Sequence, residues 1–176
     1  MTEQADKVQR IEGLMTQYGD YIIRFCYMYL KNWHLAEDAS QEVFLKSYKH
    51  LESFREEATE KTWLSSIAIN VCRNYSRTSW FKKVAIGIEV DSKSTEYSME
   101  EMLLKKVEES EILKVVGELP IKYKEVILLY YYEELKIKEI ATILHINEEA
   151  VKMRLSRARK RVSTVLKEVA LDGRMV

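Results

Sequence analysis

The chain has 176 residues, enough for one domain or for two small domains of roughly 70 residues each. With 47% hydrophobic residues it can build a core, which excludes a chain that is disordered throughout. Its 28 basic residues balance its 28 acidic ones, so any binding to DNA must come from charge that is concentrated locally.

The sequence has no signature of a cofactor, metal or membrane protein. Cys26 and Cys72 form no CxxC pair, and the three histidines lack the spacing of zinc ligands, so we expect no metal and no cofactor. The N-terminus MTEQADKVQR is polar, and no apolar run approaches the roughly 20 residues of a membrane span. We therefore expect a cytoplasmic protein in a reducing environment.

The first part of the chain, residues 1–83, predicts a domain of three helices. One proline, five glycines and apolar residues at three- and four-residue spacing favour an all-α protein. A break at residues 32–34 separates the first helix from a second at 35–51, and a third is expected at 62–79. The inward positions are Ile11, Leu14, Tyr18, Ile22, Phe25 and Tyr29, then Ala36, Ala39, Val43 and Phe44, then Leu64, Ile67, Ala68, Val71 and Tyr75.

An acidic linker is expected at residues 84–110. Residues 84–111 hold eight acids and three bases, a net charge of −5. Because residues 88–98 have no apolar period, we predict that they form a flexible linker. Met102, Leu103 and Val107 are compatible with the start of a helix.

The last part, residues 111–176, predicts a second helical domain. Pro120 suits the first turn of a helix that carries Val126, Ile127, Leu129 and Tyr130. A short helix at 137–144, a turn at 145–147 and a last helix from 148 towards 168 have the proportions of a helix-turn-helix. Asn147 is suited to cap the last helix.

The last helix has a basic face. At 100° per residue, its apolar residues gather within about 60° of one another and face the core: Val151, Leu155, Ala158 and Val162. Residues 150–161 carry six bases and no acid. A solvated helix surface is the common explanation of such a face, but on the second helix of a helix-turn-helix in a neutral protein we favour DNA binding.

Aromatic and basic residues interleave near the end of the first domain. Residues 70–83 hold four bases and no acid, together with Tyr75, Trp80 and Phe81. This pattern suits single-stranded DNA, whose bases stack on aromatic rings. We favour a core position for Trp63. Asn70 stands among apolar residues and needs a hydrogen-bond partner.

Four segments, in this order and spacing, resemble the extracytoplasmic-function sigma factors: AEDASQEVFLKSYKHLESF, TWLSSIAINVCRNYSR, ELPIKYKEVILLYYYEELKIKEIATIL and EEAVKMRLSRARKRV. The resemblance covers residues 10–168. It implies two small helical domains, a three-helix sigma region 2 and a helix-turn-helix sigma region 4, joined by a flexible linker. It also implies a protein that binds core RNA polymerase, recognises the −35 and −10 promoter elements and promotes strand opening.

The resemblance and the local charge assign roles to residues and partners. Core polymerase is expected at Asp38, Gln41, Glu42 and Leu45, the −10 element at Phe54, Asn70, Arg73 and Arg77, and the −35 element at Lys152, Met153, Arg154, Ser156, Arg157 and Lys160. The expected partners are the β′ and β subunits of the polymerase, promoter DNA and a membrane-bound anti-sigma factor, with no small-molecule substrate.

Three positions depart from the family pattern. Glu149-Ala150 stands where the family commonly has Gly-Thr, Ser66 replaces a frequent arginine, and Glu56-Glu57-Ala58 follows Arg55 in place of Gly-Asp-Ser. A carboxylate at position 149 either repels phosphate or accepts a hydrogen bond from cytosine.

Three other functions compete with this interpretation. A stand-alone helix-turn-helix regulator would use the second domain but leaves the first without a ligand or phosphoacceptor signature. An enzyme is not expected, because the sequence has no glycine-rich phosphate loop and no nucleophile-base motif. An anti-sigma factor would lack residues that read bases, and this chain has them.

Overall fold

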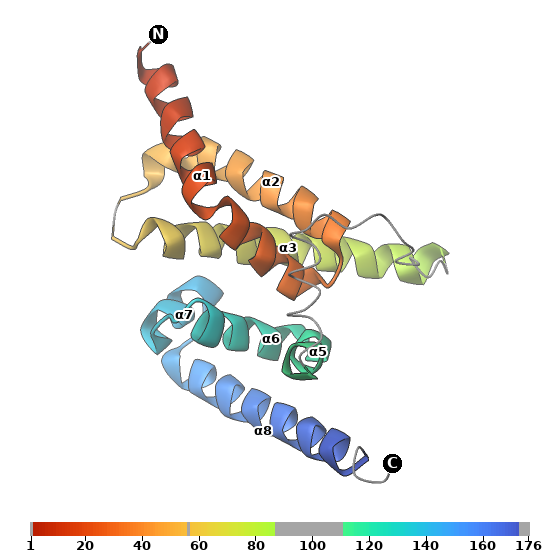
Figure 1. The fold of residues 1–176 in the computed structure, drawn as a ribbon. Helices are drawn as coiled ribbons and strands as arrows, with labels where there is room; N and C mark the ends of the chain where they lie inside the picture. The colour runs from red at the N-terminus through yellow and green to blue at the C-terminus, as the bar shows by residue number, and fades with distance from the viewer. Residues whose placement is uncertain (1, 56, 87–110, 173–176) are drawn as a thin grey trace. The chain divides into compact units, whose positions relative to one another are not determined.

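The computed structural model describes residues 2–55, 57–86 and 111–172, and the regular elements within these ranges are all helical (Figure 1). The chain divides into two compact units, Met1–Ser94 and Thr95–Val176. The predicted all-α class with two small helical domains is therefore confirmed. The expected flexible linker at 88–98 and the helix expected near Met102 lie outside the described residues.

The first unit is a three-helix bundle of α1 (Thr2–Leu30), α2 (Trp33–His50) and α3 (Glu60–Ile86), with a 3₁₀ turn η1 (Leu51–Ser53) after α2. Each of the three long helices packs against the other two. Ile22, Phe25 and Leu64 are fully buried in the core. Burial of a side chain of this size contributes about 1.5–3 kcal/mol. Three residues predicted to face inward are only half-buried: Tyr18, Ile67 and Tyr75.

Polar caps set the starts of α2 and α3. Asn32 Oδ1 accepts a hydrogen bond from the Leu35 amide at 2.9 Å, so α2 begins at Trp33, two residues before its predicted start. Thr59 Oγ1 accepts from the Thr62 amide at 3.1 Å, and α3 begins at Glu60. A cap supplies a partner for an amide that has none within the helix, which extends each helix beyond its apolar pattern.

The second unit contains α5 (Glu111–Glu118), α6 (Ile121–Ile127), a π-helical turn η2 (Leu128–Tyr132), α7 (Ile137–Leu144) and α8 (Glu148–Asp172). α8 packs against α5, α6 and α7. Pro120 lies just before α6 rather than in its first turn, and its carbonyl accepts from the Tyr123 amide at 2.8 Å. The sequence predicted a regular helix through Tyr130, whereas the Glu133 amide bonds to the Leu128 carbonyl, which gives the π spacing.

The turn between α7 and α8 has the predicted position, residues 145–147. His145 adopts a left-handed conformation with φ 54°, and the Ile146 amide donates to the Ala141 carbonyl at 3.1 Å. This pattern is the Schellman ending of a helix. Asn147 Oδ1 accepts from the Ala150 amide at 2.7 Å, which confirms Asn147 as the cap of α8.

Substitution of His145 tests the strain in this turn. The left-handed conformation costs an L-residue about 1–2 kcal/mol, and glycine avoids this cost while losing more entropy on folding. We expect His145→Gly to raise the free energy of unfolding by about 0.5–1 kcal/mol, measured from urea denaturation midpoints. His145→Ala keeps the strain and serves as the control. A midpoint that falls in His145→Gly would contradict the assignment.

A buried acid follows η2. Glu133 is 3% exposed, and neither of its carboxylate oxygens has a hydrogen-bond partner among the described residues. Burial raises the pKa of Glu133 to about 8 because the charged form is disfavoured away from water.

Glu133 makes stability depend on pH. Between the ordinary carboxyl pKa of 4.5 and about 8, the folded state retains a proton that the unfolded state has released, so stability falls as pH rises across this range. We expect Glu133→Gln to be the more stable protein at pH 8.5, by up to about 5 kcal/mol, and to show a flatter pH profile in thermal melts. The control is Glu134→Gln, at the exposed neighbour. Parallel profiles for wild type and Glu133→Gln would show that this carboxyl is not buried in solution.

Candidate nucleic-acid interface

The packing of α8 turns its basic face outward. Val151 and Ala158 are fully buried and Leu155 is 2% exposed, as the helical spacing predicted. Of the six residues predicted to contact the −35 element, Arg154 is half-buried and the others are exposed: Lys152, Met153, Ser156, Arg157 and Lys160. The structure therefore brings these residues together on one helix, along a surface that can meet a DNA groove.

Two of these basic side chains, Lys152 and Arg157, make contacts within the second unit. Lys152 Nζ lies 2.9 Å from Glu149 Oε1, and this hydrogen bond raises the pKa of Lys152. Arg157 reaches Tyr123, on α6. Burial opposes ionisation of the Tyr123 phenol, but Lys122, the hydrogen bond from Arg157 and the charge of Arg161 together lower its pKa.

An open groove of about 650 Å³ lies between α5 and the second half of α8. Its walls include Val115 from α5, Leu119 just after α5, and Arg157, Lys160 and Arg161 from α8. Arg161 also lies over the Tyr123 ring, with its guanidinium carbon 5.0 Å from the ring centre. Arg157 and Lys160 therefore border this groove as well as the outward face of the helix.

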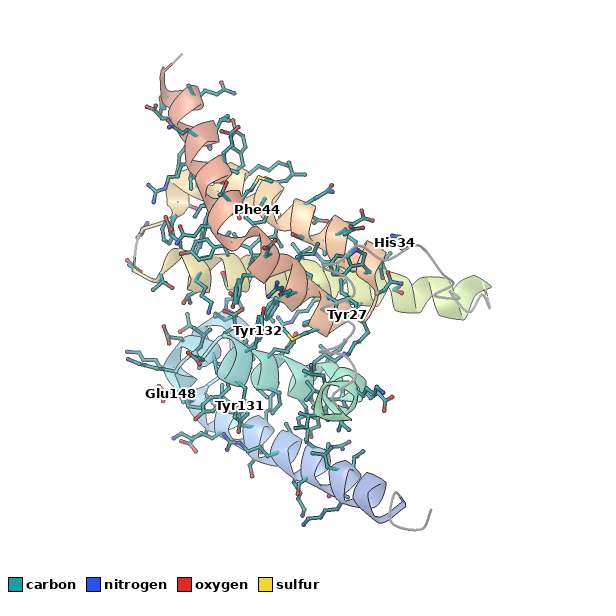
Figure 2. The ribbon with its side chains drawn as sticks, viewed as in Figure 1. Tyr27, His34, Phe44, Tyr131, Tyr132 and Glu148 are labelled. Carbon is teal, nitrogen blue, oxygen red and sulfur yellow. The ribbon has the colours of Figure 1, made fainter. Side chains whose placement is uncertain are left out.

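The sequence did not predict the contact of Arg159 on α8 with two tyrosines of η2, Tyr130 and Tyr131. Arg159 Nε donates to the Tyr131 hydroxyl at 2.7 Å, and the guanidinium lies 5.3 Å from the centre of the Tyr130 ring. Figure 2 shows Tyr131 reaching from the end of η2 towards α8. The run of three tyrosines at 130–132 was the hint of this contact in the sequence. The fold is needed to bring Tyr131 to Arg159, which lies 28 positions later in the chain.

In the first unit, Phe54 stacks on Trp63. The ring centres are 4.7 Å apart with an angle of 30° between the planes. Both side chains are half-buried, so Trp63 is not the core residue that the sequence favoured. Trp63 is only half-buried because its ring covers one side of Phe54, which follows η1. The side chains of Trp80 and Phe81 lie outside the described residues.

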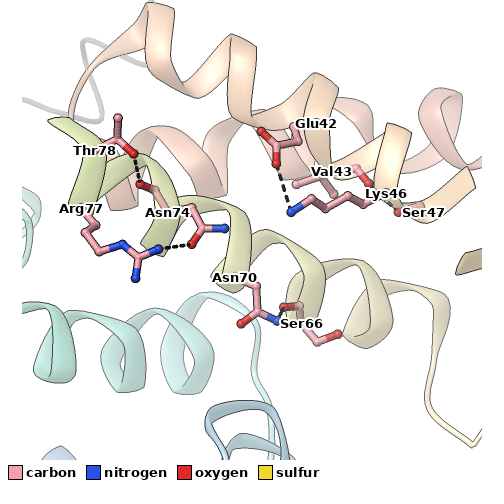
Figure 3. A network of polar contacts seen from close by, with 9 residues as sticks. All are labelled: Glu42, Val43, Lys46, Ser47, Ser66, Asn70, Asn74, Arg77 and Thr78. Atoms are coloured by element: carbon pink, nitrogen blue, oxygen red, sulfur yellow. Dashed lines mark hydrogen bonds and ion pairs between the residues drawn. The ribbon is translucent and has the colours of Figure 1, made fainter. Parts of the chain in front are cut away.

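Asn70 and Arg77 are exposed on α3, on the side turned away from α2 (Figure 3). Asn70 Nδ2 donates to the Ser66 carbonyl at 3.1 Å, one turn earlier in the same helix. Arg77 donates to Asn74 Oδ1 at 3.4 Å, and Arg73 is half-buried. The predicted −10 residues of α3 thus share a helix, while Phe54 lies in the segment before it.

The residues predicted to bind core polymerase lie along α2. Asp38 and Gln41 are exposed, and Leu45 is an apolar side chain with 63% exposure. Glu42 is half-buried and pairs with Lys46 at 3.0 Å (Figure 3). Burial, followed by the nearby Glu42 carboxylate, raises the pKa of Tyr75 on α3.

Within the described ranges, no group of three or more His, Cys, Asp or Glu side chains could hold a metal ion. The side chains of Cys26 and Cys72 are buried in the first unit. No helix in the described part of the chain is long and apolar enough to cross a membrane.

Two family models match the chain. Residues 14–82 match Sigma-70 region 2, and residues 109–162 match Sigma-70 region 4. The first covers most of the three-helix bundle, including the exposed residues of α3, and the second covers the helix-turn-helix and the basic part of α8.

Known proteins are similar over nearly the whole chain. The ECF RNA polymerase sigma factor SigM of Bacillus subtilis is 33% identical, over 88% of this chain and 94% of its own length, and SigW of the same organism is 32% identical, over 86% of each chain. In fold, the chain is similar to the sigma factor RpoE of Bartonella quintana, solved with the anti-sigma factor NepR, with a TM-score of 0.70, 20% identity and coverage of 90% and 98% of the two chains. It is also similar to CnrH, solved with the cytosolic domain of CnrY, with a TM-score of 0.67, 22% identity and coverage of 95% and 94%. On the two matched sigma-70 regions and the identity to SigM, the chain belongs to the extracytoplasmic-function (ECF) RNA polymerase sigma factors.

Proposed function

We propose that this sigma factor binds core RNA polymerase, recognises the −35 and −10 elements of a promoter and promotes strand opening during transcription initiation. The observation that carries the proposal is the exposed basic face of α8, held outward by the buried stripe of Val151, Leu155 and Ala158. The 33% identity to SigM over nearly both full lengths supports it.

The proposal divides the work along the chain. Residues 1–83 act as sigma region 2, which binds core polymerase and the −10 element. Residues 111–176 act as sigma region 4, which binds the −35 element. Residues 84–110 form the acidic linker between them, although its first three residues, 84–86, are the last residues of α3. The matches to region 2 at 14–82 and to region 4 at 109–162 support this division.

At the −35 element, α8 enters the major groove. An arginine can donate two hydrogen bonds to guanine, and lysines and arginines at the flanks neutralise phosphates. The proposed contacts are Lys152, Met153, Arg154, Ser156, Arg157 and Lys160.

At the −10 element, α3 captures unpaired bases. Asn70 offers a donor and an acceptor to the edge of an extruded base, and Phe54 forms part of the pocket. Arg73 and Arg77 neutralise the neighbouring phosphates. Unstacking a base costs a few kcal/mol, which these contacts must offset, so the strand opens through binding energy and not through a motor.

Core polymerase docks on α2. The exposed face of Asp38, Gln41 and Leu45 combines polar side chains with one large apolar side chain, and Glu42 borders it. The proposed partner surface is the coiled coil of the β′ subunit, with further contact to the β subunit. A central apolar residue surrounded by polar ones is typical of a protein interface.

The protein acts as an initiation factor in the cytoplasm, without catalytic chemistry, cofactor or small-molecule substrate of its own. We further propose that a membrane-bound anti-sigma factor holds it inactive. The similar fold of RpoE from Bartonella quintana, solved with the anti-sigma factor NepR, supports such a partner.

In vitro transcription on genomic DNA with purified core polymerase tests the proposal. New start sites should appear only when the protein is added, each preceded by common −35 and −10 sequences. Specific binding to duplex DNA by the protein alone, with no dependence on core polymerase, would instead favour a stand-alone helix-turn-helix regulator, which the family matches do not favour.

We expect a triple alanine variant of Asp38, Gln41 and Leu45 to lose core polymerase binding by about tenfold or more, because central interface residues carry most of the binding free energy. The measurement is a binding titration with labelled sigma factor. A matched control replaces an acid, an amide and an apolar residue exposed on α1, namely Asp6, Gln9 and Val8. Equal affinities for the two triple variants would remove α2 from the docking surface.

We expect Asn70→Ala to fold and to bind core polymerase normally, because Asn70 is exposed and its amide bonds only to its own helix in the described contacts. It should lose discrimination at one −10 position, measured by permanganate footprinting of open complexes across substitutions of each −10 base. Gln17→Ala removes an exposed amide from α1 as a control. A lower melting temperature with an unchanged base profile would make Asn70 a structural residue.

A further inference from the structure

An acid-base pair stands at the start of the exposed face of α8. Glu149 Oε1 and Lys152 Nζ are 2.9 Å apart, with side chains 83% and 55% exposed. Their spacing of three residues places them one turn apart on the helix. The hydrogen bond to Glu149 raises the pKa of Lys152, so the lysine remains an ammonium ion at neutral pH.

The pair lies on the face proposed to enter the groove. Counted from the buried Val151 at 100° per residue, Lys152 points about 100° away and Glu149 about 160° away. Ser156, which is exposed, lies between them at about 140°. Glu149 therefore points away from the core, and Lys152, one of the proposed −35 contacts, lies on the flank of the same exposed face.

Stability gives only a modest reason for a carboxylate here. An exposed ion pair contributes about 0–1 kcal/mol, and an acid in the first turn of a helix gains about 0.3–1 kcal/mol from the helix dipole. Asn147 already caps this turn with a 2.7 Å hydrogen bond. Residues 150–161 carry six bases and no acid, so the neighbouring Glu149 lowers the general attraction to phosphate. A residue with this effect favours discrimination between sequences over affinity for DNA.

The chemistry of the two side chains matches one base pair. A carboxylate only accepts hydrogen bonds and an ammonium only donates them. In the major groove a C·G pair presents the cytosine N4 amino group as a donor beside the guanine O6 and N7 acceptors. On an A·T pair the adenine N6 amino group stands between two acceptors, N7 and thymine O4, which both repel a carboxylate aimed at it.

We propose that Glu149 and Lys152 form a specificity-determining pair that selects a C·G base pair in the −35 element. Glu149 accepts a hydrogen bond from cytosine N4, and Lys152 donates to O6 or N7 of the paired guanine. The ion pair between them sets their relative position before DNA arrives. This inference rests on the proposed function of α8.

The test uses holoenzyme assembled from core polymerase and full-length sigma factor. A promoter found by in vitro transcription is rebuilt with a randomised −35 element, and transcribed sequences are counted for wild type and variants. Wild type should enrich C·G at one position. Glu149→Gln should reduce that enrichment at least about fivefold and shift it towards A·T, because glutamine pairs with adenine through N6 and N7. Lys152→Ala should weaken the same position. Glu148→Gln is the matched control and should leave the profile unchanged.

The outcomes separate this inference from the proposed function. If Glu149→Gln increases output from all −35 sequences alike and preserves the profile, Glu149 only repels phosphate and the inference is overturned. If wild type has a −35 preference without C·G at a position sensitive to Glu149, the inference also fails while the role of α8 stands. If wild type shows no −35 preference, and Arg157→Ala gives the same flat profile as wild type, the proposed role of α8 itself is wrong.

Discussion

The burial of Val151, Leu155 and Ala158 fixes the rotation of α8 about its own axis, and the surface that the second unit presents depends on it. These residues recur at spacings of four and three, so they form one stripe against the other helices of the unit. A shift of one residue would turn the helix by about 100° and exchange apolar for basic side chains. The hydrophobic effect therefore acts as the positioning device for the DNA-binding residues, although none of the stripe residues is exposed.

The formal net charge of the protein is zero, so attraction to DNA depends on where its basic residues are concentrated. Three arginines of α8, Arg157, Arg159 and Arg161, have tyrosine partners in the described contacts. Arg159 is held by Tyr130 and Tyr131, and Arg161 lies over Tyr123. A tyrosine orients a guanidinium without cancelling its charge, so the arginines remain available to phosphates. Lys152 differs, because the carboxylate of Glu149 offsets its positive charge as well as orienting its side chain.

The fold was largely predictable because each unit depends on amphipathic helices. The bounds of α7, the turn at 145–147 and the cap at Asn147 follow directly from apolar spacing and a capping residue. The early start of α2 was not predicted, since a cap extends a helix without any apolar signal. Trp63 was misplaced because its partner, Phe54, is an aromatic residue outside the helical pattern. The helical pattern identified which side chains of α8 and α3 are exposed, but the bases that they contact depend on DNA geometry, so those assignments stay predictions.

The π-helical turn η2 makes this part of the chain sensitive to length more than to composition. A π turn accommodates one residue more than an α-helical turn, and in η2 the Glu133 amide reaches back five residues to Leu128. Here two consecutive tyrosines both contact Arg159, whereas successive residues of a regular helix point about 100° apart. Deletion of one residue from 128–132 would restore regular helical register and change the directions in which the two rings point relative to Arg159, even if every tyrosine were kept. Related chains that differ by a single insertion or deletion at this point would thus need another partner for the same arginine.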